Sequence, residues 1–120
     1  MDMKREDKVL VVEESPIVCQ AIEAAGELPY VCDRATDGWE AIEKLEAGSY
    51  AAIVIDSDMP RHSGFGVINY LREEVGAELQ NVIVVTDADS DTLRRKLSEA
   101  KLNVVSKSDA VAELNRVMRS

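Results

Sequence analysis

Five short apolar runs, each followed by a segment with apolar residues at helical spacing, constrain the fold of this chain more than any other feature. They predict strands at Lys8–Val12, Tyr30–Cys32, Ala51–Ile55, Asn81–Thr86 and Asn103–Lys107. A run that is apolar throughout is typical of a strand covered on both faces. Strands that alternate with helices form a parallel sheet through right-handed crossovers. The sequence therefore predicts an α/β fold, with a doubly wound five-stranded parallel sheet between helices.

Helix start and stop signals fill the segments between these strands. Ser15 and Pro16 form a start signal with Ser15 as the N-cap, and Asp37 with Glu40 resembles a capping box. Gly48 can end the helix that Asp37 starts. The remaining three helices are predicted around residues 65–71, from Ser90 and from Ser108. Each predicted strand is thus followed by one helix.

Length, charge and composition exclude several classes of protein. The chain has 120 residues, of which 46% are apolar and 31% charged, so we expect one globular domain over residues 1–120. The formal net charge of −9 repels phosphate backbones, which argues against a nucleic-acid partner. The apolar runs fall far short of the roughly 18–20 residues of a membrane helix, and no signal-peptide core follows "MDMKREDK". We therefore expect no membrane partner and a cytoplasmic location.

Polar side chains follow four of the five predicted strands, at the point where each strand ends. In chain order these residues are Glu13, Glu14, Asp56, Asp58, Thr86 and Lys107. In open parallel sheets the chemistry gathers at the carboxyl ends of the strands, beside the topological switch point. We therefore expect all six residues to meet at one edge of the sheet.

Carboxylates crowded at one edge repel each other unless a cation compensates their charge. Magnesium is the natural partner, because it prefers oxygen ligands and takes only one or two carboxylates together with waters and a phosphate. Lys107 adds a positive charge, and Thr86 adds a short hydroxyl. A carboxylate held among a metal, a lysine and a hydroxyl is suited to accepting a phosphoryl group, since that transfer depends on positioning and charge neutralisation.

The chain resembles the receiver domain of two-component response regulators over essentially its whole length. The segments that carry the resemblance are "VLVVEESP", "ATDGWEAIEKLEAGSYAAIVIDSDMPRHSG", "NVIVVTDAD" and "NVVSKSD". The resemblance implies a flavodoxin-like three-layer (βα)5 sandwich with strand order 2-1-3-4-5. It also implies a phosphoacceptor rather than an enzyme, comparable to single-domain chemotaxis regulators, which receives its phosphoryl group by self-catalysed transfer.

The resemblance assigns a role to each polar residue at the predicted edge. Asp56 aligns with the phosphorylated aspartate, Thr86 with the switch hydroxyl and Lys107 with the family's lysine. Magnesium ligands would be Glu14, Asp56 and the backbone carbonyl of Asp58, with Glu13 acting indirectly. The implied partners are a histidine kinase or phosphotransfer protein, and a downstream protein that binds the face of the fourth helix, fifth strand and fifth helix.

Three positions depart from the family pattern. Glu14 stands where the family usually has aspartate, so an extra methylene lies between the backbone and the metal-binding carboxylate. Val104 stands at the switch position usually held by tyrosine or phenylalanine, and Ser108 replaces the usual proline. These departures bear on magnesium affinity and on the coupling between Val104 and Thr86.

Two other functions stay open at this point. Glu14, Val104 and Ser108 are compatible with an atypical receiver-like interaction module that works without phosphorylation. Asp56 and Asp58 also form a DxD pair at a strand end, as in haloacid-dehalogenase-like phosphatases. Against that enzyme, its nucleophile normally follows the first strand of the core, and 120 residues leave no room for a substrate cap.

Overall fold

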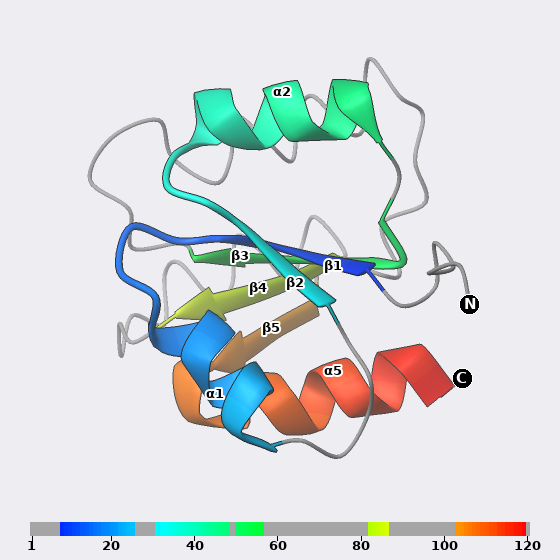
Figure 1. Ribbon diagram of the computed structural model, residues 1–120. Helices are drawn as coiled ribbons and strands as arrows, with labels where there is room; N and C mark the ends of the chain where they lie inside the picture. The colour runs from blue at the N-terminus through cyan, green and yellow to red at the C-terminus, as the bar shows by residue number, and fades with distance from the viewer. Residues whose placement is uncertain (1–7, 26–30, 49, 57–81, 87–102, 120) are drawn as a thin grey trace.

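The computed structural model describes residues 8–25, 31–48, 50–56, 82–86 and 103–119. Five parallel strands form one sheet in the order β2-β1-β3-β4-β5 (Figure 1). The strands are β1 (Lys8–Val12), β2 (Val31–Ala35), β3 (Ala52–Asp56), β4 (Val82–Thr86) and β5 (Asn103–Ser106). The predicted doubly wound α/β fold and its strand order are confirmed. The helices predicted around residues 65–71 and from Ser90 lie outside the described residues.

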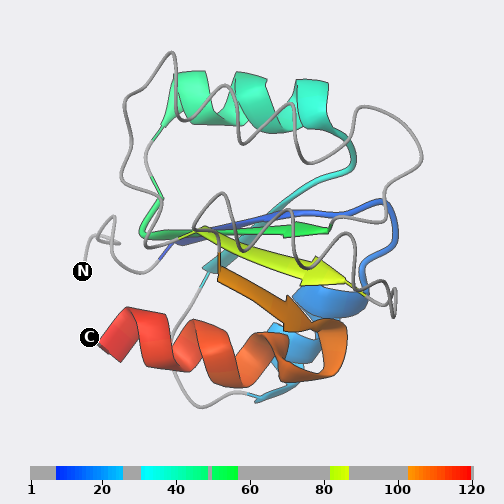
Figure 2. The same ribbon diagram turned by 180° about the vertical axis from the view of Figure 1, so that it is seen from behind.

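Helices cover both faces of the sheet. Helix α2 (Gly38–Ala47) lies on one face, and α1 (Ile17–Ala25) and α5 (Ala110–Arg119) lie on the other, as the two opposite views show (Figures 1 and 2). Successive side chains of a strand point to opposite faces. In β1, Leu10 and Val12 therefore pack on the α2 side, while Val9 and Val11 pack on the side of α1 and α5. None of the helices in the described part of the chain is long and apolar enough to cross a membrane.

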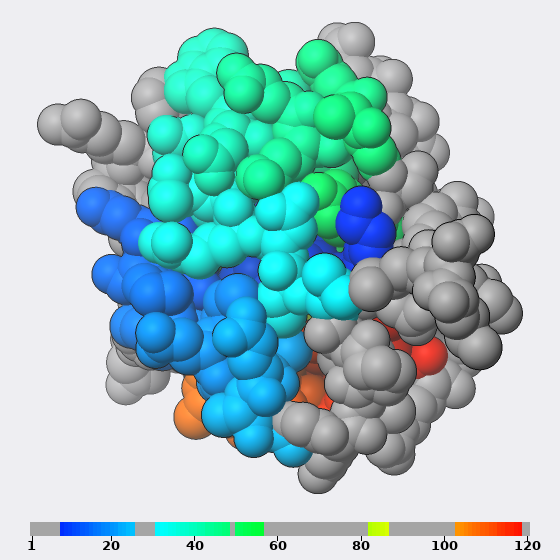
Figure 3. All heavy atoms as spheres, viewed as in Figure 1, coloured from blue at the N-terminus to red at the C-terminus, as the bar shows by residue number. Residues whose placement is uncertain are grey.

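Strands β3 and β4 are buried along their full length and β1 is buried from Val9 onward, whereas β2 is an edge strand with mixed burial. Figure 3 shows β2 at the surface between α1 and α2. The predicted strand ended at Cys32, but the observed one continues to Ala35, because every residue from Val31 onward pairs with β1. Asp33 and Arg34 conceal this continuation in the sequence, since an edge strand tolerates polar side chains that a central strand does not.

The first amides of α1 and α2 are capped by different kinds of residue. At α2, the predicted cap Asp37 is confirmed, because its Oδ1 accepts from the Glu40 amide at 2.9 Å; the return bond differs from a capping box, since Glu40 Oε1 accepts from the amide of Thr36, the residue before the cap, at 3.1 Å. At α1, the predicted cap was Ser15, but the Glu13 carboxylate accepts the amides of the first turn instead.

The end of β5 also differs from the prediction. The strand ends at Ser106, and a single 3-10 turn, η4 (Lys107–Asp109), connects it to α5. Ser108 therefore lies inside this turn and does not cap the last helix, which begins at Ala110. The Ser106 hydroxyl is 3.0 Å from the Ser108 hydroxyl and donates to Asp109 at 3.0 Å.

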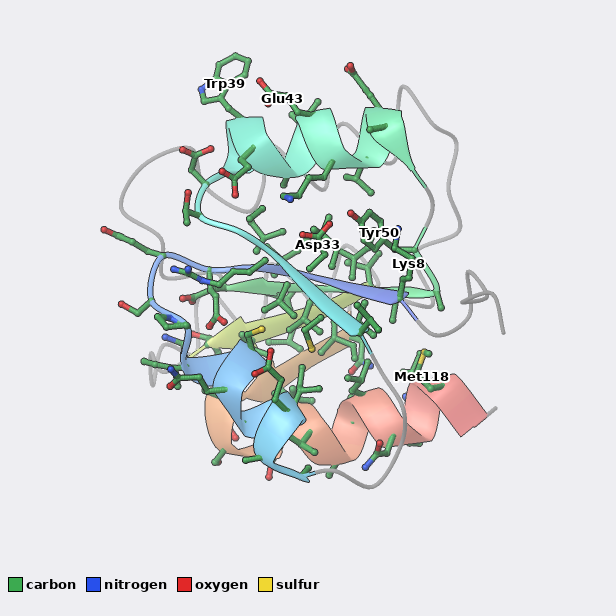
Figure 4. The ribbon with its side chains drawn as sticks, in the orientation of Figure 1. Lys8, Asp33, Trp39, Glu43, Tyr50 and Met118 are labelled. Carbon is green, nitrogen blue, oxygen red and sulfur yellow. The ribbon has the colours of Figure 1, made fainter. Side chains whose placement is uncertain are left out.

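A polar cluster fastens α2 to the edge of the sheet. Figure 4 shows Asp33 of β2, Tyr50 and Lys8 grouped beneath α2. The Asp33 carboxylate accepts from the Lys44 ammonium at 2.8 Å and from the Tyr50 hydroxyl at 2.5 Å. The Lys8 ammonium lies 5.1 Å from the centre of the Tyr50 ring, within the range of a cation–π interaction. These contacts hold α2 above β1 and β2.

Candidate functional site

Two buried polar residues end the central strands at the carboxyl edge of the sheet. Asp56 is the last residue of β3 and is 8% exposed, and Thr86 is the last residue of β4 and is buried. In the register of these strands Asp56 pairs with Val85, so Thr86 lies one residue further along the neighbouring strand. The apolar residues of both strands are packed in the core on the two faces of the sheet. This packing fixes the positions of Asp56 and Thr86 at the ends of the strands.

Lys107 brings a positive charge to Asp56. Its ammonium lies 3.3 Å from Asp56 Oδ2, and most of both side chains is buried. Lys107 follows β5 directly, two strands away from Asp56, so the pair depends on the order of β3, β4 and β5 in the sheet. In a largely buried ion pair, the attraction between the charges offsets part of the cost of removing each of them from water. The arrangement places a carboxylate oxygen beside a cation that is positioned to stabilise further negative charge.

Glu13 lies at the end of β1 and is 2% exposed. Its carboxylate oxygens accept from the amides of Val18 and Cys19, each at 2.9 Å. The first amides of a helix have no partner within the helix, and a negative charge there also interacts favourably with the helix dipole. Glu13 therefore caps α1. Its predicted indirect role toward a metal stays a prediction, with both carboxylate oxygens already bonded to protein donors.

Glu14 is exposed, unlike its neighbour. Its backbone carbonyl accepts a hydrogen bond from Arg34 Nη2 of β2. The Glu13 amide donates to the Ala35 carbonyl at 2.9 Å, so the end of β2 also holds the residue before Glu14. Sequence reasoning missed Arg34 altogether, because nothing in the sequence links it to a residue 20 positions earlier.

Two of the predicted magnesium ligands, Asp56 and Glu14, have carboxylates that the described part of the chain does not use to cap a helix. Within the described residues, no group of three or more histidine, cysteine, aspartate or glutamate side chains is placed to hold a metal ion. Magnesium needs only one or two carboxylates, because it keeps several waters. Asp56 and Glu14 supply hard oxygen donors of this kind at the ends of β3 and β1, whereas Glu13 is committed to α1. The predicted carbonyl ligand, Asp58, lies outside the described residues.

Val104 lies in β5, opposite Val84 of β4. It is half-buried and packs against the core cluster on the α2 side of the sheet. Thr86 comes two residues after Val84, and side chains two apart in a strand share a face. Val104 and Thr86 are therefore on the same face of neighbouring strands, at a diagonal. The predicted switch role of both residues stays a prediction.

The family model and curated relatives that match this chain concern response regulators or proteins of two-component signalling. The family model of the response regulator receiver domain matches residues 9–119. The transcriptional regulatory protein DltR of Streptococcus agalactiae is 33% identical over 86 residues, which cover 71% of this chain and 37% of DltR. The chain spans about a third of the length of the first curated relatives that it matches.

Solved structures with the same fold cover nearly the whole chain. The response regulator TrrA of Thermotoga maritima, solved in complex with Mg²⁺ and BeF, is 29% identical with a TM-score of 0.73, over 94% of this chain and 96% of TrrA. The chemotaxis protein CheY4 of Vibrio cholerae is 22% identical with a TM-score of 0.75, over 92% and 97% of the two chains. At that identity, the likeness to CheY4 concerns the fold alone.

Proposed function

The chain belongs to the receiver domain family of two-component response regulators, and we propose that it accepts a phosphoryl group on Asp56. The donor would be a histidine kinase or a histidine phosphotransfer protein, and residues 1–120 would act as one receiver domain in the cytoplasm. The observation that carries the proposal is the Lys107 ammonium, 3.3 Å from the Asp56 carboxylate at the carboxyl edge of the sheet.

The chemistry follows from the position of Asp56. One carboxylate oxygen attacks the phosphorus of the phosphohistidine, and an O–P bond forms as the P–N bond breaks. The electron pair of the broken bond stays on the imidazole nitrogen, which then takes up a proton. Lys107 is close enough to stabilise the charge that gathers on the phosphoryl oxygens, and electrostatic stabilisation of this kind often contributes more to catalysis than any other effect. Thr86 would donate its hydroxyl to a phosphoryl oxygen once the group is in place.

Receiver domains typically use magnesium at the acidic pocket, where it neutralises charge on the transferred group. In this chain Asp56 and Glu14 would hold the ion, together with the backbone carbonyl of Asp58. Glu13 would contribute indirectly, by fixing the start of α1 beside these ligands.

Receiver domains are signalling proteins rather than typical enzymes, and we propose that the output of this chain is a protein–protein interaction. The surface would include β5, α5 and the helix predicted from Ser90. Val104 provides the link to the site, because it shares a face with Thr86 on the neighbouring strand. A valine has no ring to move inward, so the change at this surface would come from the backbone of β5 rather than from an aromatic rotamer.

Intact-mass spectrometry after incubation with Mg²⁺ and acetyl phosphate tests the proposal. We expect the chain to gain the mass of one phosphoryl group, and we expect the Asp56→Asn variant to gain none. Asp58→Asn is the matched control, since it changes the neighbouring aspartate in the same way, and it should still be phosphorylated. A wild-type chain without added mass, or an Asp56→Asn variant that gains the same mass, would contradict the proposal.

One observation favours the second function, an interaction module that works without phosphorylation. Glu13, the first residue of the acidic pair, uses both carboxylate oxygens to cap α1, which leaves fewer ligands for magnesium. If this function is correct, the wild-type chain binds its protein target equally well with and without Mg²⁺ and acetyl phosphate. A target affinity that rises on phosphorylation would exclude it.

A further inference from the structure

Arg34 reaches from the edge strand β2 to the turn that carries the acidic pair. Its Nη2 donates to the Glu14 carbonyl. Its Nε is enclosed and has no hydrogen-bond partner in the described part of the chain. A buried donor without a partner is costly and calls for an explanation. The guanidinium thus bonds to Glu14 through Nη2 while its Nε has no partner among the described residues.

The acidic turn, residues 13–16, is held at several points. Before Glu14, the Glu13 amide donates to Ala35 of β2 and the Glu13 carboxylate caps α1. After it, the Ile17 amide donates to the Ser15 carbonyl at 2.8 Å. At Glu14 itself, the bond from Arg34 is what ties the backbone to the sheet. The side chain of Glu14 is exposed, so the bond to its backbone carbonyl fixes the point from which the side chain extends.

We propose that Arg34 is a positioning residue for the phosphoryl-transfer site: it holds the backbone of Glu14 and thereby fixes where the Glu14 carboxylate is presented beside Asp56. The inference rests on the proposed function, in which Glu14 is a metal ligand. It explains why an arginine stands beside Glu14, a proposed magnesium ligand, where its charge alone is unfavourable. It also suits the longer glutamate, whose carboxylate can wander further than that of an aspartate unless its backbone is fixed.

The sign of the change in magnesium affinity separates positioning from simple electrostatics. If Arg34 acts only through its charge, the Arg34→Met variant removes a nearby positive charge and binds Mg²⁺ more tightly. If Arg34 positions Glu14, the same variant binds Mg²⁺ more weakly, by about 10-fold, as is typical when a partner of a metal ligand is lost. A purely structural role would lower the thermal midpoint and leave the affinity unchanged.

The experiment combines Mg²⁺ titration calorimetry with amide hydrogen exchange in EDTA. The matched control is Arg116→Met, because Arg116 is exposed and bonds to Glu113 of its own helix α5. For Arg34→Met we expect weaker Mg²⁺ binding and faster exchange in the peptide that contains the acidic turn. Arg34→Gln, which keeps a neutral amide donor, should recover part of both losses. Arg116→Met should match the wild type in both measurements.

Unchanged or tighter Mg²⁺ binding in Arg34→Met would overturn the proposal, and so would unchanged exchange in the acidic turn. A wild-type chain that binds no Mg²⁺ would be a failure of the proposed function instead. The metal-free exchange measurement would then decide on its own whether Arg34 holds the turn.

Discussion

Glu13 and Asp56 are two buried carboxylates at the ends of neighbouring paired strands, yet their surroundings differ in kind. Glu13 follows Val12, and Asp56 follows Ile55, which is the residue that Val12 pairs with. The oxygens of Glu13 are bonded to the amides of α1, whereas Asp56 lies beside the charge of a lysine side chain. Backbone amides hold a carboxylate in place. A lysine ammonium, on a flexible side chain, can instead move with a phosphoryl group that is added to the carboxylate. The comparison shows Glu13 as the cap of α1 and supports the chemical role that we propose for Asp56.

The largest effect is expected from exchanging the two carboxylates for their amides, one at a time. Asp56→Asn removes the nucleophile and should abolish phosphorylation. Glu13→Gln keeps one carbonyl oxygen as an acceptor for α1 and should leave phosphorylation largely intact. Intact-mass spectrometry after incubation with acetyl phosphate and Mg²⁺ measures both. An equal loss of phosphorylation in the two variants would contradict the different roles assigned to Glu13 and Asp56.

Lys107→Met tests the chemical side of the comparison. The variant keeps the length of the side chain and removes the charge 3.3 Å from Asp56. We expect the rate of phosphorylation to fall by about 100-fold, in line with the loss of one stabilising group at a reacting oxygen. The rate is measured with acetyl phosphate at saturating Mg²⁺, and Lys44→Met serves as a control because Lys44 pairs with Asp33 beneath α2. A rate equal to that of the control would show that Lys107 takes no part.

Glu13→Ala tests the structural side. The variant leaves two amides at the start of α1 without their partner, and we expect the free energy of unfolding to fall by about 1–3 kcal/mol. Glu14→Ala, at the exposed neighbouring position, should change it by less than about 0.5 kcal/mol. Urea unfolding in EDTA measures both without any metal contribution. A Glu14→Ala variant that is the less stable of the two would contradict the assignment of the cap.

A third carboxylate, Asp33, is bonded to side chains instead of backbone amides, and we expect a smaller effect on stability from replacing it than from replacing Glu13. Burial acts to raise the pKa of Asp33, but the bonds from Lys44 and Tyr50 and the charges of Lys44 and Lys8 outweigh it, so the pKa lies below the ordinary value of 3.8. Because the folded pKa is depressed, these interactions stabilise the fold in full above pH 3.8 and are lost as the pH falls through the folded pKa.

Asp33→Asn should therefore cost less than about 1 kcal/mol near neutral pH, since the Lys44 pair is about one-third exposed. The difference in unfolding free energy between this variant and the wild type should shrink towards about pH 3. Urea unfolding at the two pH values measures it. A difference that grows in acid would mean that folding raises the pKa of Asp33 instead of lowering it.

The order of the five strands, and of the helices in the described part of the chain, was predictable because it depends on periodic apolar residues, which the local sequence displays. The β2 strand was predicted too short because Asp33 and Arg34 look unlike strand residues, and their place is set by pairing with β1. The meeting of Asp56 and Lys107 followed from the rule that carboxyl ends of parallel strands share an edge.

The different roles of Glu13, which caps α1, and Glu14, which is exposed, were not predictable. Glu13 reaches amides five and six residues ahead, which requires the turn to fold back over the end of β1. Ser15 offered the more usual local cap, and no local pattern distinguishes the two. The contact between Arg34 and Glu14 is likewise tertiary, since it exists only when β2 lies beside β1.

The most direct test of the central claim is to locate the phosphoryl group on the chain. Borohydride reduces an acyl phosphate to an alcohol, so a phosphorylated aspartate becomes homoserine, which peptide mass spectrometry can place. After incubation with acetyl phosphate and Mg²⁺, we predict homoserine at position 56 and unmodified glutamate at positions 13 and 14. Reduction at Glu13 or Glu14, or an unmodified residue at position 56, would contradict the account.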